Sequence, residues 1–498
     1  MNVPAKTSAP SAAAARQRGP RFWFALAAAA LLVTALAAAV AVQVVGVAPR
    51  LLGPYLERRA SGHHPLIEAT GRALSRVLIW LDRGELSPRP EYPAWALPPR
   101  VAAAATAEFA RVVLIAEAQQ LASILIDARP GDALTFAPGT YRFSGRGITV
   151  HRAGRADAPI TLRAAQPGSV TLEFDLLEGF HVNAPHWVFE NLTIVGTCRD
   201  HNACEHAFHV VGSATHVVIR NNVLREFNAH IKINGSGGRY PDDGRIEGNR
   251  IFNTAPRVTA APVTPIDLVA ASGWHIEGNL IADFIKAGGD LTSYGAFAKG
   301  GGAGNVFARN VVLCEHRLRG AERGRGHKGR RVGLSFGGGG SDPRGCREGR
   351  CAVEHERGVM RDNLIASCSD DGIYINRSAQ TQLVHNTVLD TAGINVRFGE
   401  SAARIEGNWV DAPIAARDGA TVVARENRSE SLPPMYAGIA GLFSPFANDA
   451  ELDLRWEVAP PRRTGLAEFG IDLCAFRRPA APVLGAFDDI SRCTPARK

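Results

Sequence analysis

The stretch Ile276-Glu277-Gly278-Asn279-Leu280-Ile281 recurs, with variations, from residue 188 onward. In each copy a hydrophobic residue stands three positions before an asparagine, and a small or hydrophobic residue stands two positions after it. The asparagines of the eight copies are Asn191, Asn222, Asn249, Asn279, Asn310, Asn363, Asn386 and Asn408. Successive copies are 31, 27, 30, 31, 53, 23 and 22 residues apart. Such near-regular self-similarity indicates a repeat architecture.

The kind of repeat follows from the segments between the asparagines. They are short, rich in β-branched residues and alternating, whereas helical repeats need long segments of 3.6-residue period. The leucine lattice of a leucine-rich repeat is absent. Periods of 22–31 residues therefore predict the coils of an all-β parallel β-helix, a solenoid whose coils stack at about 4.8 Å. An asparagine at one fixed turn can form a hydrogen-bonded ladder, so we expect these asparagines to be structural.

Working outward toward the N-terminus, residues 128–141 read ARPGDALTFAPGTY and follow a helix expected over roughly residues 102–126. This segment resembles the helix-capped first coil of the right-handed parallel β-helix superfamily that contains the pectate lyases. Residues 154–162, GRADAPITL, resemble the second coil of its alginate- and chondroitin-lyase branch, and residues 471–488 resemble a closing tail. The resemblance covers about residues 115–490. It implies a right-handed parallel β-helix with an N-terminal capping helix and a polysaccharide-related activity.

The N-terminus has the features of a membrane anchor. Residues 1–21 carry Lys6, Arg16, Arg18 and Arg21 without an acidic residue, and residues 22–48 contain no charge. About 20 apolar residues suffice to cross a bilayer, and a basic flank stays in the cytoplasm. We therefore expect a cytoplasmic tail at 1–21, a signal anchor or transmembrane helix at 22–48, and a body in the periplasm or extracellular space. A cleaved secretory signal is the alternative, although its apolar region is normally shorter.

The rest of the chain divides into two parts. Residues 49–110 are expected to form a stalk and linker, with an amphipathic helix over 65–81 and a proline-rich stretch over 87–99. Residues 111–498 would form the β-helix domain, with a basic insertion at about 316–357. A hydrophobic content of 46% with 21% charged residues excludes a wholly disordered chain.

Eight cysteines, an even number, suit an oxidising compartment. Cys198 is expected to pair with Cys204, and Cys346 with Cys351, because each pair is close in sequence. The other four cysteines are expected to form two further disulfides, whose pairing the sequence leaves open: Cys314, Cys368, Cys474 and Cys493. The spacings contain no CxxC, so a zinc site of cysteines is disfavoured.

The net charge of +8 is concentrated in two places. Residues 1–21 contribute +4 and residues 317–331 contribute +6, so the remainder of the chain carries −2. We expect residues 317–331 to form a rim that binds a polyanion; a solvated loop is the alternative. Nucleic acid is not expected as a partner, since the body is exported and contains no stacking motif with interleaved aromatic residues.

One strand of each coil is expected to stack into a sheet whose alternate residues point outward. These strands are expected at 207–211, 230–234, 266–269, 296–299, 334–336, 373–376, 394–398 and 414–417. With the aliphatic residues inside, the outward residues are His209, His230, Lys232, Asn234, Asp267, Phe297, Lys299, Ser335, Tyr374, Asn376, Asn395, Arg397 and Arg417. Such a polar and basic face suits a sugar polymer that carries carboxylates.

Cleavage of such a polymer by β-elimination needs a cation or donor on the uronate carboxylate, a base for the C5 proton and an acid for the leaving oxygen. The residues assigned to catalysis are Lys232 as the base, Arg397 as a carboxylate clamp, and Tyr374 and His230 as acids. The residues assigned to substrate binding are His209, Asn234, Asp267, Lys299, Asn376, Arg377 and Arg417; His209 is also an alternative acid and Lys299 an alternative clamp.

Four points stay open. The resemblance implies acidic Ca²⁺ ligands on adjacent coils, but Asp267 is isolated and Asp290 is expected in a turn, so no metal ligands and no cofactor are assigned and Ca²⁺ is left open. Asp370 and Asp371 could be the carboxylate pair of an inverting glycosidase, whose carboxylates stand ~6.5–9.5 Å apart, or simply a turn. A C5-epimerase would share the proton abstraction. A protein that binds or helps to assemble an acidic polysaccharide without cleaving it is the other reading. In each case we expect a monomer.

Overall fold

The computed structural model describes residues 20–101, 109–321, 328–338, 341, 343–463 and 470–493. Most of the basic tail and part of the basic insertion, Arg323 and Arg325 included, lie outside the described residues. The chain divides into two units, residues 1–47 and residues 48–498. The first unit contains α1 (Pro20–Val45), in which Leu26–Val44 is long and apolar enough to cross a membrane by length and composition.

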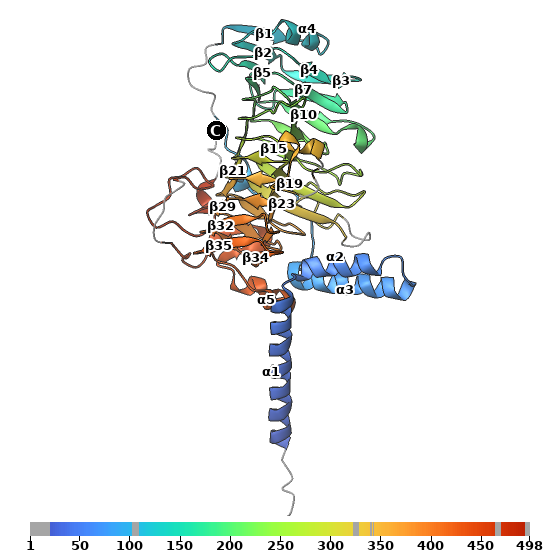
Figure 1. The fold of residues 1–498 in the computed structure, drawn as a ribbon, viewed down its shortest axis with the longest axis vertical. Helices are drawn as coiled ribbons and strands as arrows, with labels where there is room; N and C mark the ends of the chain where they lie inside the picture. The colour runs from blue at the N-terminus through green and yellow to red at the C-terminus, as the bar shows by residue number, and fades with distance from the viewer. Residues whose placement is uncertain are drawn as a thin grey trace, which may run out of the picture. The chain divides into compact units, whose positions relative to one another are not determined.

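The second unit is a right-handed parallel β-helix, which Figure 1 shows as a stack of short strands. Within the described residues each coil contributes strands to three parallel sheets. The first sheet consists of β1 (Arg111–Ile115), β2 (Asp132–Phe136), β5 (Ile160–Ala164), β8 (Trp187–Glu190), β11 (Val218–Arg220), β14 (Arg245–Glu247), β17 (His275–Glu277), β21 (Val306–Ala308), β25 (Val359–Arg361), β29 (Thr381–Val384), β32 (Ala402–Glu406) and β35 (Thr421–Arg425).

The second sheet is the one whose strands were expected to carry the functional face. It consists of β4 (Ile148–Val150), β7 (Glu178–Val182), β10 (His206–Val211), β13 (Ile231–Asn234), β16 (Ile266–Val269), β19 (Thr292–Lys299), β23 (Arg330–Phe336), β27 (Ile373–Asn376), β31 (Ile394–Arg397) and β34 (Ile414–Arg417). All eight expected strands therefore lie in one sheet. β23 lies inside the expected insertion, so part of that segment builds a coil.

The third sheet closes each coil. It consists of β3 (Gly139–Ser144), β6 (Val170–Asp175), β9 (Thr193–Gly196), β12 (Val223–Arg225), β15 (Arg250–Phe252), β18 (Leu280–Ala282), β22 (Val311–Leu313), β26 (Leu364–Ala366), β30 (Thr387–Leu389) and β33 (Trp409–Val410). Its outward leucines pack against the C-terminal segment, which contains α5 (Leu432–Ala437) and the antiparallel pair β36 (Phe446–Asn448) and β37 (Asp453–Trp456). A small sheet of β20 (Gly302–Ala303), β24 (His355–Glu356) and β28 (Ser378–Ala379) lies at a turn.

The interior of the solenoid is hydrophobic, because the inward residues of all three sheets are aliphatic or aromatic. Phe180, Phe189 and Phe208 are fully buried, and their ring centroids lie 5.1–5.4 Å apart. Burying a phenylalanine side chain contributes roughly 1.5–3 kcal/mol. The stacked coils therefore share one continuous core.

The expected asparagine ladder is present, with two corrections. In each step the side-chain oxygen of one asparagine accepts hydrogen bonds from the backbone N–H and side-chain amide of the asparagine one coil earlier, as between Asn279 and Asn249 (2.9 and 3.0 Å). Asn191 is not a rung, because Phe189, not Val188, pairs with Ile219, which puts Leu192 in the ladder position. Asn427 is a further rung that the repeat pattern missed.

The N-terminal cap also differs from the expectation. β1 (Arg111–Ile115) occupies the middle of the segment expected to be helical, and the capping helix α4 (Gln120–Asp127) begins later. The alternation of exposed and covered residues in Arg-Val-Val-Leu-Ile suits a strand that pairs with β2 on one side.

Residues 49–83, expected in the stalk, form the helices α2 (Pro49–Ala60) and α3 (Pro65–Arg83). The two helices pack against each other and against the side of the solenoid. Arg50 forms an ion pair with Asp82 and donates a hydrogen bond to the carbonyl oxygen of Cys368 (3.1 Å). Arg83 forms an ion pair with Glu315, and both side chains are buried. The helical hairpin is therefore part of the folded body.

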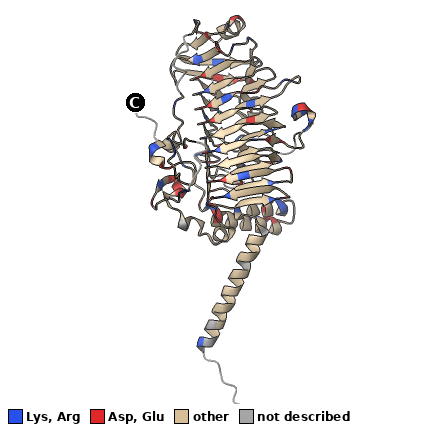
Figure 2. Ribbon diagram, turned by 60° about the vertical axis from the view of Figure 1, so that its left-hand side comes forward, with Lys and Arg blue, Asp and Glu red and all other residues tan. Residues whose placement is uncertain are grey.

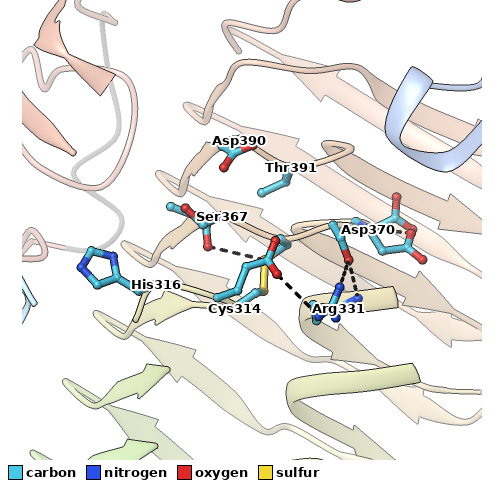
Figure 3. The surroundings of a disulfide bond; sticks show 12 residues. Cys314, His316, Arg331, Ser367, Asp370, Asp390 and Thr391 are labelled. Carbon is cyan, nitrogen blue, oxygen red and sulfur yellow. Dashed lines mark hydrogen bonds and ion pairs between the residues drawn. A yellow bond between two sulfur atoms is a disulfide. The ribbon is translucent and has the colours of Figure 1, made fainter. Parts of the chain in front are cut away.

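All eight cysteines form disulfides. The two expected pairs, Cys198–Cys204 and Cys346–Cys351, are confirmed. The pairing left open is Cys314–Cys368 and Cys474–Cys493. Figure 3 shows the first of these beside Arg331, Ser367 and Asp390, where it joins two neighbouring coils next to the helical hairpin.

Candidate functional site

The outward face of the second sheet carries two rows of side chains in register. The first row contains Thr149, His181, His209, Lys232, Asp267, Phe297, Ser335, Tyr374, Asn395 and Ala415. The second row contains Val211, Asn234, Val269 and Lys299, and farther along Asn376, Arg397 and Arg417. Figure 2 shows Lys, Arg, Asp and Glu distributed along the stacked strands.

His230 was expected to point outward, and this expectation is wrong. It is fully buried, its Nε2 lies 3.3 Å from the carbonyl oxygen of Phe252, and its ring packs edge-on against Phe227. Burial lowers the pKa of His230 to about 3. β13 begins only at Ile231, so His230 lies in the bend before the strand and does not follow the strand alternation. It cannot contact a substrate on the outward face.

Most of the remaining predicted residues form two clusters, of which the first lies toward the N-terminal coils. The Nζ of Lys232 is 2.8 Å from Oδ2 of Asp267, and Nε2 of His209 is 2.7 Å from Oδ1 of Asn234. The base role was predicted on the assumption that other cations surround Lys232. Its nearest partner is instead the buried carboxylate of Asp267. We call these four residues, with Glu178 and His181, the N-terminal cluster.

Glu178 and His181 were missed by the sequence reasoning. Oε1 of Glu178 is 2.9 Å from Nδ1 of His209, and Oε2 is 3.2 Å from Nδ1 of His181. The two histidines hold the pKa of Glu178 at about 2. These residues precede the first asparagine rung, so the repeat pattern did not cover them. The tripeptide Phe-His-Val at 180–182 and again at 208–210 was the feature that could have found them.

The second cluster, which we call the C-terminal cluster, consists of Asp371, Tyr374, Asn376, Asn395 and Arg397. Nδ2 of Asn376 donates to the Tyr374 hydroxyl (3.0 Å), and Nδ2 of Asn395 donates to Oδ2 of Asp371 (2.9 Å). Arg397 lies in register with Asn376 and forms an ion pair with Asp418 (2.6 Å).

The electrostatics of the C-terminal cluster favour a neutral carboxyl group beside cations. Burial and the neighbouring Asp370 raise the pKa of Asp371 to about 8, against the influence of Arg417 and Arg397. Burial also raises the pKa of Tyr374 above its ordinary value, although Arg397 opposes this shift. Asp371 is therefore protonated at neutral pH and can donate a hydrogen bond to another carboxylate.

The other predicted binding residues lie between or beside the clusters. The Lys299 ammonium lies 4.8 Å from the ring centroid of Phe297. Arg377 stacks over Phe398 at 5.3 Å, and Arg417 extends the second row past Arg397. In the basic insertion, Arg319 and Arg331 are buried and form ion pairs with Asp390 and Glu315.

The predicted catalytic residues do not converge on one point. Lys232 on β13 and Tyr374 on β27 are separated by four strand steps in the sheet. At about 4.8 Å a step, the two residues lie about 19 Å apart along the solenoid. They cannot act on the same glycosidic bond, but one extended polymer could contact both clusters.

Ca²⁺ binds six to eight oxygen atoms, many of them from carboxylates. Arg330 lies 3.8 Å from Asp370, and Asp371 accepts a hydrogen bond from the side-chain amide of Asn395. These two carboxyl groups are therefore surrounded by cationic and N–H groups. Glu178, His181 and His209 each place one ligand atom within 4.8 Å of the others and could hold a metal ion. Two imidazole nitrogens and one carboxylate suit a zinc-like ion better than Ca²⁺.

Comparison with known proteins supports the fold. No family model matches the chain, and no curated protein matches it. Among solved structures, the chain is similar to pectate lyase Pel9A, with 14% identity and a TM-score of 0.50 over 76% of this chain and 96% of that one. It is also similar to an alginate lyase from Paenibacillus sp. str. FPU-7, with 16% identity and a TM-score of 0.33 over 64% of this chain and 99% of that one. The first similarity places the chain in the class of right-handed parallel β-helix proteins.

Proposed function

We propose that this protein is an exported, membrane-anchored polysaccharide lyase that binds a uronate-containing polymer along the outward face of the second sheet. The observation that carries this proposal is the C-terminal cluster, in which a neutral carboxyl group, a tyrosine and Arg397 lie on adjacent coils, with Arg417 on the next coil. The similarity to a pectate lyase fold supports it. The four disulfides and the apolar α1 support export and anchoring.

Each residue of the C-terminal cluster, together with Arg417, has a separate role in β-elimination. Arg397 and Arg417 bind the uronate carboxylate, and the protonated Asp371 donates a hydrogen bond to it, so that negative charge developing at C5 is stabilised. Tyr374 removes the C5 proton as a phenolate, and the proton then passes to the leaving oxygen as the C4–O bond breaks and a C4–C5 double bond forms. Asn376 and Asn395 orient Tyr374 and Asp371.

The N-terminal cluster then binds the same polymer about 19 Å from the bond that is cleaved. Lys232 provides a cation for a second carboxylate, with Asn234 and His209 beside it. Lys232→Ala should therefore raise KM several-fold and change kcat little, because remote binding is lost while the reacting groups remain. A 100-fold fall in kcat at unchanged KM would instead restore Lys232 as the base.

The full-length protein in detergent, incubated with alginate, pectate and glycosaminoglycans, tests the main proposal through the ultraviolet absorbance of unsaturated products. We expect Tyr374→Phe and Arg397→Ala to lower the rate by about 10²–10⁴-fold. The matched control is Arg404→Ala, since Arg404 is also half-exposed and paired to a carboxylate but lies on the first sheet. No absorbance with any polymer would contradict a lyase, and C5 proton exchange without cleavage would indicate an epimerase.

A second candidate function rests on Asp370 and Asp371. Two adjacent carboxyl groups, of which one is neutral near pH 7, are the arrangement that acid–base hydrolysis uses. A glycosidase would release reducing ends without unsaturated products, so the same incubation distinguishes the two reactions.

A further inference from the structure

We propose that Glu178, His181 and His209 form a binding site for a divalent cation of the zinc class. The three side chains come from neighbouring strands β7 and β10, on which His181 and His209 are in register. The Glu178 carboxylate lies between the two imidazoles, with one oxygen facing each Nδ1 at 2.9 and 3.2 Å. All three side chains are between 17% and 33% exposed, so an ion can reach them from solvent.

The hydrogen bonds of His209 determine which of its nitrogens is free. Asn234 donates through Nδ2 to the carbonyl oxygen of Gly235 (3.0 Å), which leaves its Oδ1 to face Nε2 of His209 at 2.7 Å. Since an amide oxygen can only accept, Nε2 of His209 carries a proton, and Nδ1 is the nitrogen that faces Glu178. This is the arrangement of a metal-binding histidine, whose other ring nitrogen donates to an oxygen that orients the ring.

The free Nδ1 of His209 has no hydrogen-bond partner of suitable geometry, although it is buried and a carboxylate oxygen lies 2.9 Å away. A cation that binds both atoms gives the buried nitrogen a partner. Zn²⁺ accepts imidazole nitrogen and carboxylate oxygen at about 2.0–2.2 Å and, with three protein ligands, keeps a position open.

The test uses the full-length protein after treatment with a chelator. We expect one equivalent of Zn²⁺ by isothermal titration, and visible d–d absorption when Co²⁺ replaces it. His181→Ala and His209→Ala should each weaken binding at least 10-fold, while Ca²⁺ should produce no saturable heat. Thermal unfolding without metal shows whether each variant is folded.

The matched control is the pair His186 and His216, which also stack between neighbouring coils, with ring centroids 4.8 Å apart. His186→Ala with His216→Ala should leave Zn²⁺ binding unchanged. Equal Zn²⁺ affinity in wild type and folded His209→Ala, or no saturable binding in the wild type, would overturn the site. None of these readouts depends on the polysaccharide reaction, so the failure of one proposal leaves the other intact.

A different observation carries a second inference. We infer that the outward face of α3 lies in the interface of a phospholipid bilayer. Its large hydrophobic residues are exposed on one side, Leu66 by 71% and Trp80 by 65%, together with Ile67, Leu74 and Val77. At 100° per residue these five side chains fall within one arc of about 140°. The opposite side, with Gly71, Ser75 and Ile79, is buried.

The packing of the hairpin does not need this apolar face. A Cβ on Gly71 would lie 2.5 Å from the Cβ of Ala60, and one on Gly53 would lie 3.1 Å from the carbonyl oxygen of Ser75, so α2 and α3 meet through small residues. The amphipathic helix thus turns its apolar side to solvent, which is the reverse of a soluble helix. Contiguous exposed apolar residues of this kind mark an interaction surface.

The short connection to α1 and the neighbouring arginines indicate that the partner is a membrane. Residues 46–48 alone connect the end of α1 to the start of α2, and three residues reach about 10 Å. If α1 crosses a membrane, as the proposed anchoring requires, the hairpin begins at the surface of that membrane. Arg72 and Arg76 are exposed on α3 itself, and basic residues on a helix that has an apolar face with a tryptophan suit anionic lipid headgroups.

The test reconstitutes the full-length protein, with a protease site inserted between Gly46 and Val47, into vesicles that contain anionic phospholipid. After cleavage we expect the body to float with the vesicles. Leu74→Glu with Val77→Glu should release it, whereas Ile126→Glu, at a position on α4 that is 61% exposed, should not. Release of the cleaved wild-type body would overturn the inference.

The experiment gives a different result if α1 does not anchor the protein in the membrane. If the uncleaved chain does not associate with vesicles, α1 is not an anchor, and the cleaved body is then added to vesicles directly. Binding that the double glutamate variant abolishes would still support the α3 surface, and absence of binding would refute it.

Discussion

At the scale of single residues, the chemistry depends on how burial changes protonation. Asp371 is the clearest case, because burial and Asp370 raise its pKa to about 8, so that it is neutral where an ordinary aspartate is charged. In contrast, Tyr374 has a pKa above its usual value and is mostly protonated at neutral pH. The proposed reaction needs Asp371 with its proton and Tyr374 without one.

This requirement predicts the pH dependence of kcat/KM. The fraction of Tyr374 phenolate rises with pH throughout the neutral and alkaline range, while the protonated fraction of Asp371 falls above about pH 8. The value of kcat/KM should therefore rise to about pH 8 and then level off. Asp371→Asn keeps a neutral donor at every pH, so its profile should continue to rise above pH 8. Identical wild-type and variant profiles, measured by product absorbance, would remove Asp371 from the reaction.

At the scale of elements, the asparagine ladder holds the turns of successive coils together. Asn279 accepts from the backbone N–H and the amide of Asn249, and its own amide donates to Ile246 and Asn310. Asn191 lies one position before the ladder, at a positive φ of 64°. At the same position in later coils, directly before the ladder asparagine, Gly248 and Gly278 have the same left-handed backbone.

We expect Asn279→Ala to lower the free energy of unfolding by about 3 kcal/mol or more, because several buried donors and acceptors lose their partner at about 1–3 kcal/mol each. Asn191→Gly is the control and should change stability by less than about 1 kcal/mol, since glycine adopts the same backbone at that turn. Urea unfolding measures both. Equal losses would mean that the ladder contributes no more than an ordinary turn.

At the scale of the whole molecule, buried ion pairs attach the helical hairpin to the solenoid. Burial alone would raise the pKa of Asp390, but Arg319, Arg83 and Arg50 hold it well below its usual value. Two of these arginines come from the hairpin, and Figure 3 shows Asp390 near the Cys314–Cys368 disulfide. A carboxylate with a lowered pKa stabilises the fold above its unfolded pKa of about 4, and this stabilisation is lost as pH falls below that value.

Asp390→Asn should therefore destabilise the protein at pH 7 by about 2–4 kcal/mol, because three arginines lose their shared carboxylate. The difference between wild type and variant should shrink as pH falls below 4, because Asp390 of the wild type then takes up a proton in the unfolded state but not yet in the folded state. Urea unfolding at pH 7 and pH 3 tests this. A difference that stays constant between the two pH values would show that the ion pairs are not its cause.

The sequence by itself determined the fold and most of the outward face. The alternation of aliphatic and polar residues places Lys232, Asn234, Tyr374 and Arg397 outside, because strand periodicity is local and each coil repeats it. Residues in bends do not obey that periodicity, which is why the orientation of His230 could not be read from its position. Stacking also depends on register, and the repeat pattern does not show that Asn191 lies one residue away from the ladder.

Only the tertiary structure decided which outward residues are neighbours. The number of coils between two strands sets their separation, so Lys232 and Tyr374 lie about 19 Å apart, whereas Glu178 and His209 meet. The docking of α2 and α3 likewise depends on ion pairs between residues more than 200 positions apart, such as Arg83 and Glu315. Local patterns fix each coil, but distances between coils and contacts across the chain arise only when the coils stack.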